Sequence, residues 1–174
     1  MGKTSEFIVA AAEWYNGRTE KPNNSGFTDP AFEKELSAMG WQKSYAWCAF
    51  FTKLIYTKAY KNDAKLSVVV KNRFNGGALA TYNNAKVDGT FKVSDVPVIG
   101  AIAVWQHGSS SSGHVGIVKS FDLKTNTMYC IEGNTNASGS REGDRVAIKA
   151  RTIKRDRSAS GLNLKGFIYP IELS

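Results

Sequence analysis

Cysteine is scarce in this sequence: Cys48 and Cys130 are the two cysteines among 174 residues. Two are too few for a disulfide scaffold, and no C-x-x-C pair indicates zinc binding or redox exchange. The chain also lacks internal repeats and long linkers, and its length suits one domain with a substantial core. We therefore expect residues 1–174 to form a single domain that holds no metal and no cofactor.

Long apolar segments are absent as well. Residues 1–6 are followed by only a short apolar stretch before Glu13, which is too short and too charged for a signal peptide or a membrane span. We expect a monomer that is made in the cytoplasm and does not enter membranes.

Acidic residues are outnumbered, with 15 Asp and Glu against 23 Lys and Arg and a net charge of +8. Such a charge attracts polyanions, whether nucleic acid, anionic lipid or an anionic cell-wall polymer. The chain has no basic zinc finger, no RNA-binding strand motif and no run of five Lys or Arg residues. A nucleic-acid partner is therefore not expected.

Hydrophobic periodicity divides the chain into a helical part and a part made of strands. Helices are predicted at 4–15, from Pro30 to about Gly40, at 47–60, at 67–74 and at 78–85. After a weak alternation at 89–93, strands are predicted at 101–105, 114–121, 127–132, 146–152 and 166–171. This order predicts an α+β fold, with N-terminal helices packed on an antiparallel sheet of about five or six strands.

Cys48 lies at the start of the apolar run 47–60, which predicts a buried helix. A cysteine in the first turn of a helix faces unpaired backbone N–H groups and the positive end of the helix dipole, which favour the thiolate. The alternative is a buried, unreactive thiol, the state of most free cysteines and the default for Cys130.

His114 stands at the mouth of a predicted strand, directly after a serine-rich loop, and the next strand ends at Glu132 and Asn134. The short connection makes these strands antiparallel neighbours, so the start of one lies beside the end of the other. We therefore expect His114 to meet Glu132 and Asn134, which share a face if alternation is strict.

His107 is the other candidate for the catalytic histidine. The alternative is that His107 is a solvated loop residue. The basic residues 149–157 are expected to form a solvated edge, and Trp105 to be part of the core.

A thiolate, an imidazole and a carboxylate or amide together form a set that hydrolyses amides. The thiolate attacks the carbonyl carbon, the imidazole takes and returns protons, and the third group orients the ring. A helix that starts at the sheet edge would add N–H groups for the oxyanion. Papain-like folds have this order: the helices precede the sheet, and the cysteine precedes the histidine, which precedes an Asn, Asp or Glu. Either Glu132 or Asn134 can be the direct partner of His114, and Glu132 is slightly favoured.

Three motifs resemble the CHAP family, the cysteine, histidine-dependent amidohydrolases/peptidases that cut peptidoglycan. They are Trp-Cys-Ala at 47–49, Gly-His-Val-Gly-Ile-Val at 113–118 and Glu-Gly-Asn at 132–134. The similarity spans 41–152, and the run 131–136 is similar to phage and prophage members. The resemblance implies a papain-like CHAP domain with Cys48 as nucleophile, His114 as general base and acid, and Glu132 with Asn134 as the orienting pair.

Two features differ from the family pattern. Some members bind calcium through aspartates just before the cysteine, but residues 40–45 carry no carboxylate here, so no structural calcium is expected. Many members have Gln directly before the nucleophile, where this chain has Trp47. Tyr45 and Trp47 are the side chains considered for contact with the substrate or the oxyanion.

The resemblance implies an endolysin-like peptidoglycan hydrolase that works through an acyl-enzyme, as an N-acetylmuramoyl-L-alanine amidase or a stem-peptide endopeptidase. Bacterial peptidoglycan is then the partner, reached after release through a holin or a secretion machine. Two alternatives stand beside this hypothesis: a secreted antibacterial amidase toxin, and a non-catalytic module that binds cell-wall glycans through its basic surface.

Overall fold

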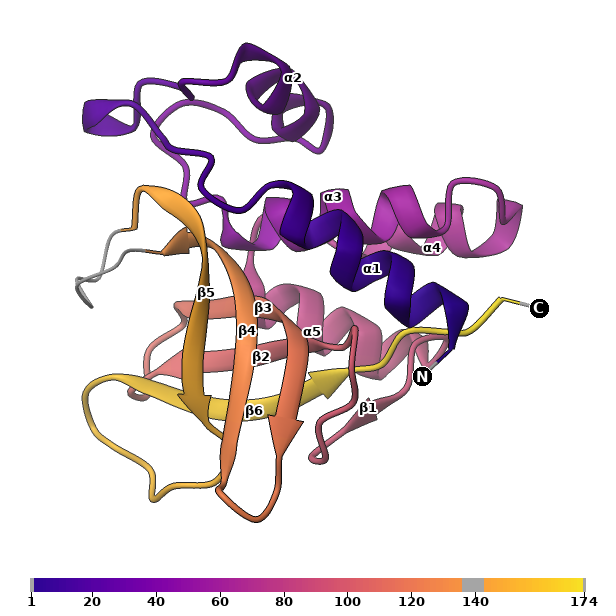
Figure 1. Cartoon of the computed structure of the whole chain (residues 1–174), viewed down its shortest axis with the longest axis vertical. Coiled ribbons are helices and arrows are strands. Elements are labelled where there is room, and N and C mark those ends of the chain that lie inside the picture. The colour runs from indigo at the N-terminus through magenta and orange to yellow at the C-terminus, as the bar shows by residue number, and fades with distance from the viewer. Residues whose placement is uncertain (1, 136–142, 174) are drawn as a thin grey trace.

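The computed structural model describes residues 2–135 and 143–173. Helices come first and strands second, as the sequence predicts (Figure 1). The helices are α1 (Lys3–Trp14), the 3₁₀ helix η1 (Pro22–Asn24), α2 (Pro30–Ala38), α3 (Cys48–Ala59), α4 (Ala64–Arg73) and α5 (Ala78–Asp88). The strands are β1 (Val93–Ser94), β2 (Ile102–His107), β3 (Gly113–Asp122), β4 (Thr127–Thr135), β5 (Arg145–Thr152) and β6 (Leu162–Ile168).

Side-chain caps explain where two of the helices begin. The Asp29 carboxylate accepts the N–H groups of Ala31 and Phe32, so α2 starts at Pro30, as predicted. The Asp63 carboxylate accepts the N–H of Leu66 in the same way. Helix α4 therefore starts at Ala64 and not at 67, because this cap outweighs the weak periodicity of the residues that follow it.

The strands form one antiparallel sheet in the order β1-β6-β2-β3-β4-β5. The predicted α+β fold with five or six strands is confirmed. The last strand was predicted too late in the chain, at 166–171. It begins at Leu162, which pairs with His107 on β2. It ends before Pro170, since proline has no N–H to donate to a ladder.

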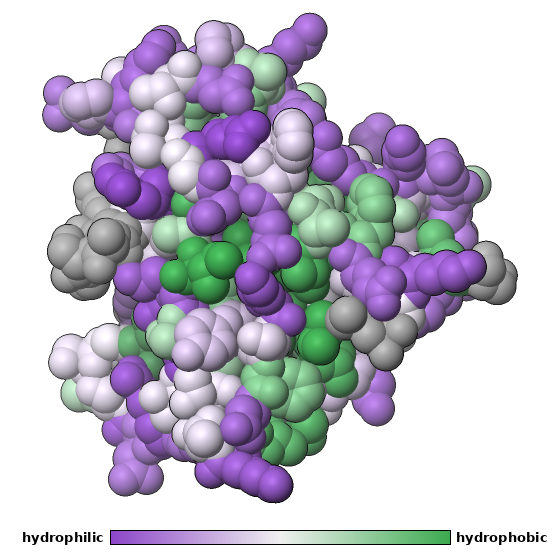
Figure 2. Space-filling model, viewed as in Figure 1, coloured by the Kyte–Doolittle hydropathy of each residue, from purple (hydrophilic) through white to green (hydrophobic). Residues whose placement is uncertain are grey.

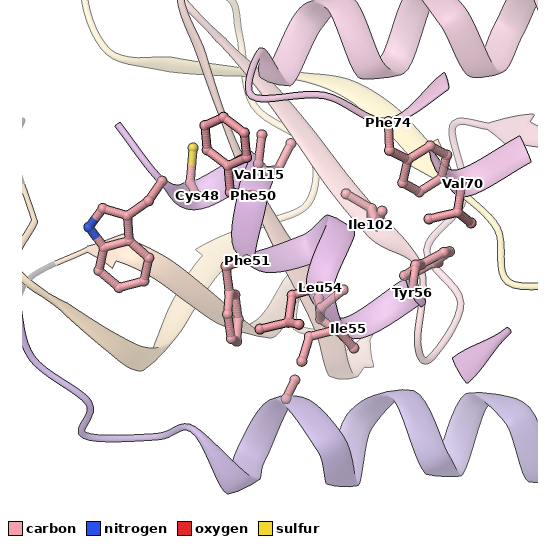
Figure 3. Packing of buried hydrophobic residues seen from close by; sticks show 14 of the residues in the cluster. Cys48, Phe50, Phe51, Leu54, Ile55, Tyr56, Val70, Phe74, Ile102 and Val115 are labelled. Carbon is pink, nitrogen blue, oxygen red and sulfur yellow. The ribbon is translucent and has the colours of Figure 1, made fainter. Parts of the chain in front are cut away.

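The main apolar core lies between the helices and one face of the sheet. Helix α3 packs on β3 and β4, and its Phe51, Leu54 and Ile55 are buried in this core (Figure 3). A second, smaller cluster fills the opposite face, which we call the inner face. Trp105 on β2 and Cys130 on β4 belong to it. Strands β4 and β5 run across β2 and β6 in Figure 1, and this curvature encloses the inner face.

On the face seen in Figure 2, hydrophobic residues lie at the centre and toward the lower right, with hydrophilic residues among and around them. Among the helices of the described ranges, none is both long enough and apolar enough to cross a lipid bilayer.

Candidate active site

Cys48 is the first residue of α3, where backbone N–H groups without partners inside the helix can interact with a negative charge. The first bond within the helix runs from the Phe51 N–H to the Trp47 carbonyl, at 2.9 Å, so the N–H groups of residues 48–50 are not used inside the helix. The thiol is free, and its residue is 5% exposed. Cys48 belongs to the main core cluster, and its sulfur points to the side of the helix opposite Phe51 (Figure 3).

The Trp47 side chain does not reach the site, which corrects the expectation that it contacts substrate or the oxyanion. Its ring is fully buried against Phe27 and Phe32, with centroids 5.0 and 5.8 Å away. Its indole N–H donates to the Glu20 carboxylate over 2.9 Å. Trp47 therefore anchors the first turn of α3 in the core, and any oxyanion donor must come from the backbone or another side chain.

Two motif glycines allow the close approaches that assemble the site. A Cβ at Gly133 would lie 2.7 Å from the Trp47 ring and 2.8 Å from Phe51 Cβ, so glycine lets β4 lie against the first turn of α3. A Cβ at Gly116 would lie 2.6 Å from Glu132 Cγ. Glycine here leaves space on β3 for the Glu132 side chain.

His114 and Glu132 meet where the antiparallel hairpin of β3 and β4 predicts. The Ile117–Ile131 register puts the start of β3 beside the end of β4. His114 Nε2 lies 2.8 Å from Glu132 Oε2, and Glu132 is completely buried. His114 is 8% exposed and therefore lies at the rim of the interior. Of the two residues considered as its direct partner, the structure places Glu132 in contact.

Asn134 occupies a different position from the one that strict alternation predicts. Its backbone has a φ of 53°, and the β4–β5 pairing shifts register between Glu132 and Thr135. Among the described residues, no hydrogen bond joins the Asn134 side chain to His114. The irregularity at the end of β4 is the physical reason that the two-residue period cannot be carried past Glu132.

The protonation of His114 is set by its two neighbours. Burial by itself would lower the pKa of His114, but hydrogen bonds with Cys48 and Glu132, and the charges of those two groups, raise it to about 10. Burial would raise the pKa of Glu132, but hydrogen bonds from Arg151 and His114 lower it. The favoured state at neutral pH is therefore a His114 imidazolium paired with the Glu132 carboxylate.

The free energy of unfolding is expected to fall as the pH rises from 6.5, the ordinary histidine pKa, to about 10. The folded state holds a proton on His114 that the unfolded chain releases, so this stabilisation is complete below pH 6.5 and is lost as the pH passes about 10. Urea denaturation across this range would measure it. The control is His114→Gln, whose stability should decline less steeply; an equal decline would contradict the prediction.

Arg151 on β5 completes the buried charge network, and sequence reasoning missed it. Its Nε donates to Glu132 Oε1 over 2.7 Å, and its Nη2 donates to Glu132 Oε2, which makes a bidentate pair. The guanidinium lies 5.5 Å from the centre of the Trp105 ring. That ring in turn lies 6.0 Å from the His114 ring. Arg151 and Trp105 thus support Glu132 and His114 from the inner face.

One signal in the sequence pointed to Arg151. A carboxylate inside a predicted strand needs a cation, and residues 149–157, predicted as a solvated edge, supply several. To predict which of these cations contacts Glu132, one needs the register of β4 against β5. The irregularity after Glu132 means that this register cannot be read from the sequence. In the structure Arg151 pairs with Met128 and reaches Glu132 along the strand direction.

The two remaining candidates lie outside this network. Tyr45 is 51% exposed and precedes the first turn of α3, and its carbonyl accepts the Trp41 indole N–H over 2.9 Å. His107 ends β2, in register with Leu162. The histidine that contacts the buried carboxylate is therefore His114.

Comparison with known proteins agrees with the motifs. Residues 40–134, more than half of the chain, match the family model described as CHAP domain. No match was found among curated proteins, and none among solved structures. The matched segment includes the first turn of α3, the start of β3 and the end of β4, which are the three places where Cys48, His114 and Glu132 lie. The chain therefore belongs to the CHAP family, whose members act on peptidoglycan as amidases or peptidases.

Proposed function

We propose that this protein hydrolyses an amide bond of bacterial peptidoglycan through a covalent thioester on Cys48. The observation that supports this most strongly is the buried series of hydrogen bonds from His114 through Glu132 to Arg151, with Cys48 near enough to His114 to help raise its pKa. A buried, unreactive thiol would not need a charged imidazole beside it, and the imidazolium would not need a buried carboxylate held by arginine.

In the proposed reaction the Cys48 thiolate attacks the amide carbonyl carbon, and a C–S bond forms. The oxygen takes the negative charge opposite the N–H groups of residues 48–50. When the C–N bond breaks, the His114 imidazolium gives its proton to the departing amine. Water then loses a proton to His114 and attacks the thioester, the C–S bond breaks, and the acid product leaves with the Cys48 thiolate restored.

The remaining residues orient these groups. Glu132 fixes the His114 ring through Nε2 and stabilises its positive charge, and Arg151 keeps Glu132 ionised. Asn134, partly buried after Glu132, belongs to the proposal as a supporting residue, and half-exposed Tyr45 as a substrate contact.

Selective alkylation tests the proposal, because the two cysteines differ in exposure. One equivalent of iodoacetamide is expected to modify Cys48, which is 5% exposed and beside His114, and to leave Cys130, which is 0% exposed. The rate of fragment release from purified sacculi should fall in proportion to the fraction of Cys48 that is alkylated. Mass spectrometry would measure both the alkylated fraction of the protein and the released products. Full hydrolysis by protein alkylated at Cys48 would contradict the proposal.

The products also decide the finer points. An N-acetylmuramoyl-L-alanine amidase releases whole stem peptides that begin with alanine, whereas an endopeptidase releases fragments cut within the stem. We propose an endolysin-like role, with release through a holin or a secretion machine, on the similarity of 131–136 to phage members. Lysis of an expressing bacterium only when a holin is supplied would support this role, and lysis of neighbouring cells by a delivered protein would favour the toxin.

A further inference from the structure

A pocket of about 280 Å³ adjoins the candidate active site on the inner face of the sheet. Trp105 and Arg151, which contact His114 and Glu132, form part of its wall. The rest of the wall comes from the end of β5 and the chain just after it, from β6, and from Asp95, which follows β1. Cys48, His114 and Glu132 are not part of this wall, so the pocket is distinct from the place where the amide would be attacked.

The pocket is strongly basic. Beyond Arg151, its wall carries the cations Lys154, Arg155, Arg157 and Lys165 and a single carboxylate, that of Asp95. Among the residues that the structure describes, none of those four cations takes part in an ion pair. Cations gathered around a cavity create a positive potential there, which attracts an anion of matching size.

The backbone that carries these cations is held in place. The buried Asn163 side chain donates to the carbonyls of Gly108 and Ser158 and accepts the Ser158 N–H, which ties the segment after β5 to β6. The Asn126 side chain bonds both the N–H and the carbonyl of Lys154, at 2.8 and 2.7 Å. A rim fixed in this way loses little conformational entropy when a ligand binds.

We propose that this pocket binds a phosphate group, either as free phosphate or as the phosphodiester of an anionic polymer. Phosphate matches the pocket better than a carboxylate, because several cations surround one cavity and phosphate offers more oxygens and more charge to them. Arg151 links the bound phosphate to the active site, since it forms the pocket wall while it holds Glu132. This site stands independently of the proposed hydrolysis.

Isothermal titration with inorganic phosphate, and with short poly(glycerol phosphate), would test the proposal at fixed low ionic strength. The double variant Lys154→Gln/Arg157→Gln is expected to weaken binding at least about tenfold, the loss of roughly one charge-assisted hydrogen bond. The control is Lys61→Gln/Lys65→Gln, which removes the same charge from exposed positions outside the pocket and should leave affinity nearly unchanged. Polymer binding that the pocket variant weakens would identify a phosphodiester ligand, and phosphate binding alone would identify the free anion.

A second measurement uses arginine side-chain NMR signals. Phosphate is expected to shift the Nε–H signal of Arg151 and not that of Arg73, which is paired with Asp88 away from the pocket. Absence of phosphate and polymer binding, or equal weakening by both double variants, would overturn the proposal. Cys48→Ala should bind phosphate normally, so loss of hydrolysis and loss of phosphate binding are separate results.

Discussion

Replacing Cys48 by alanine is expected to slow the release of fragments from purified sacculi by about 10⁴-fold or more, because removal of a catalytic nucleophile has effects of that size. The fold should be retained, since alanine suits the first turn of a helix and the change removes a single sulfur atom. Initial rates of fragment release would measure the loss of activity, and thermal unfolding would show that the variant is folded.

Cys130→Ala is the matched control, because it removes the same atom from the fully buried inner face. It is expected to lower stability through the cavity that it leaves, and to keep the activity of each folded molecule. Hydrolysis at the normal rate by Cys48→Ala would defeat the proposed mechanism. If the unmodified protein bound sacculi without cutting them, and salt weakened that binding, the non-catalytic glycan-binding module would be favoured instead.

Arg151→Met is expected to lower the free energy of unfolding by about 3 kcal/mol, because it leaves the Glu132 carboxylate buried with one fewer cation. This value is at the lower end of the loss of stability expected when one partner of a buried ion pair is removed, because the Arg151 side chain keeps 24% of its surface exposed. Methionine retains the apolar contact with Trp105. Urea denaturation at neutral pH would measure the change. Hydrolysis should fall as well, because Glu132 no longer holds His114 as firmly.

The double variant Glu132→Gln/Arg151→Met separates the two effects. It removes both charges, so much of the lost stability should return, while activity should stay low because His114 lacks its carboxylate. Arg73→Met, which breaks the exposed ion pair with Asp88, should change stability little. An Arg151→Met protein as stable as the parent would show that the buried pair does not stabilise the fold.

Much of the fold could be predicted because its signals are local. Asp29 and Pro30 mark the start of α2 through a cap and a fixed φ, and the run 47–60 shows a helix whose first residue is a cysteine. The contact between His114 and Glu132 also followed from local features, since a short hairpin needs no long-range information. Errors arose where pairing with a distant strand set the boundary, as at Leu162.

By itself the sequence determined the α+β order, the position of Cys48 at a helix start and the meeting of His114 with Glu132, because periodicity, caps and short turns act between neighbouring residues. Only the tertiary structure decided that Trp47 is buried against Glu20, that Arg151 neutralises Glu132 and that several cations line one pocket. These outcomes depend on strand register and on packing between segments far apart in the chain, and no local pattern of residues specifies either.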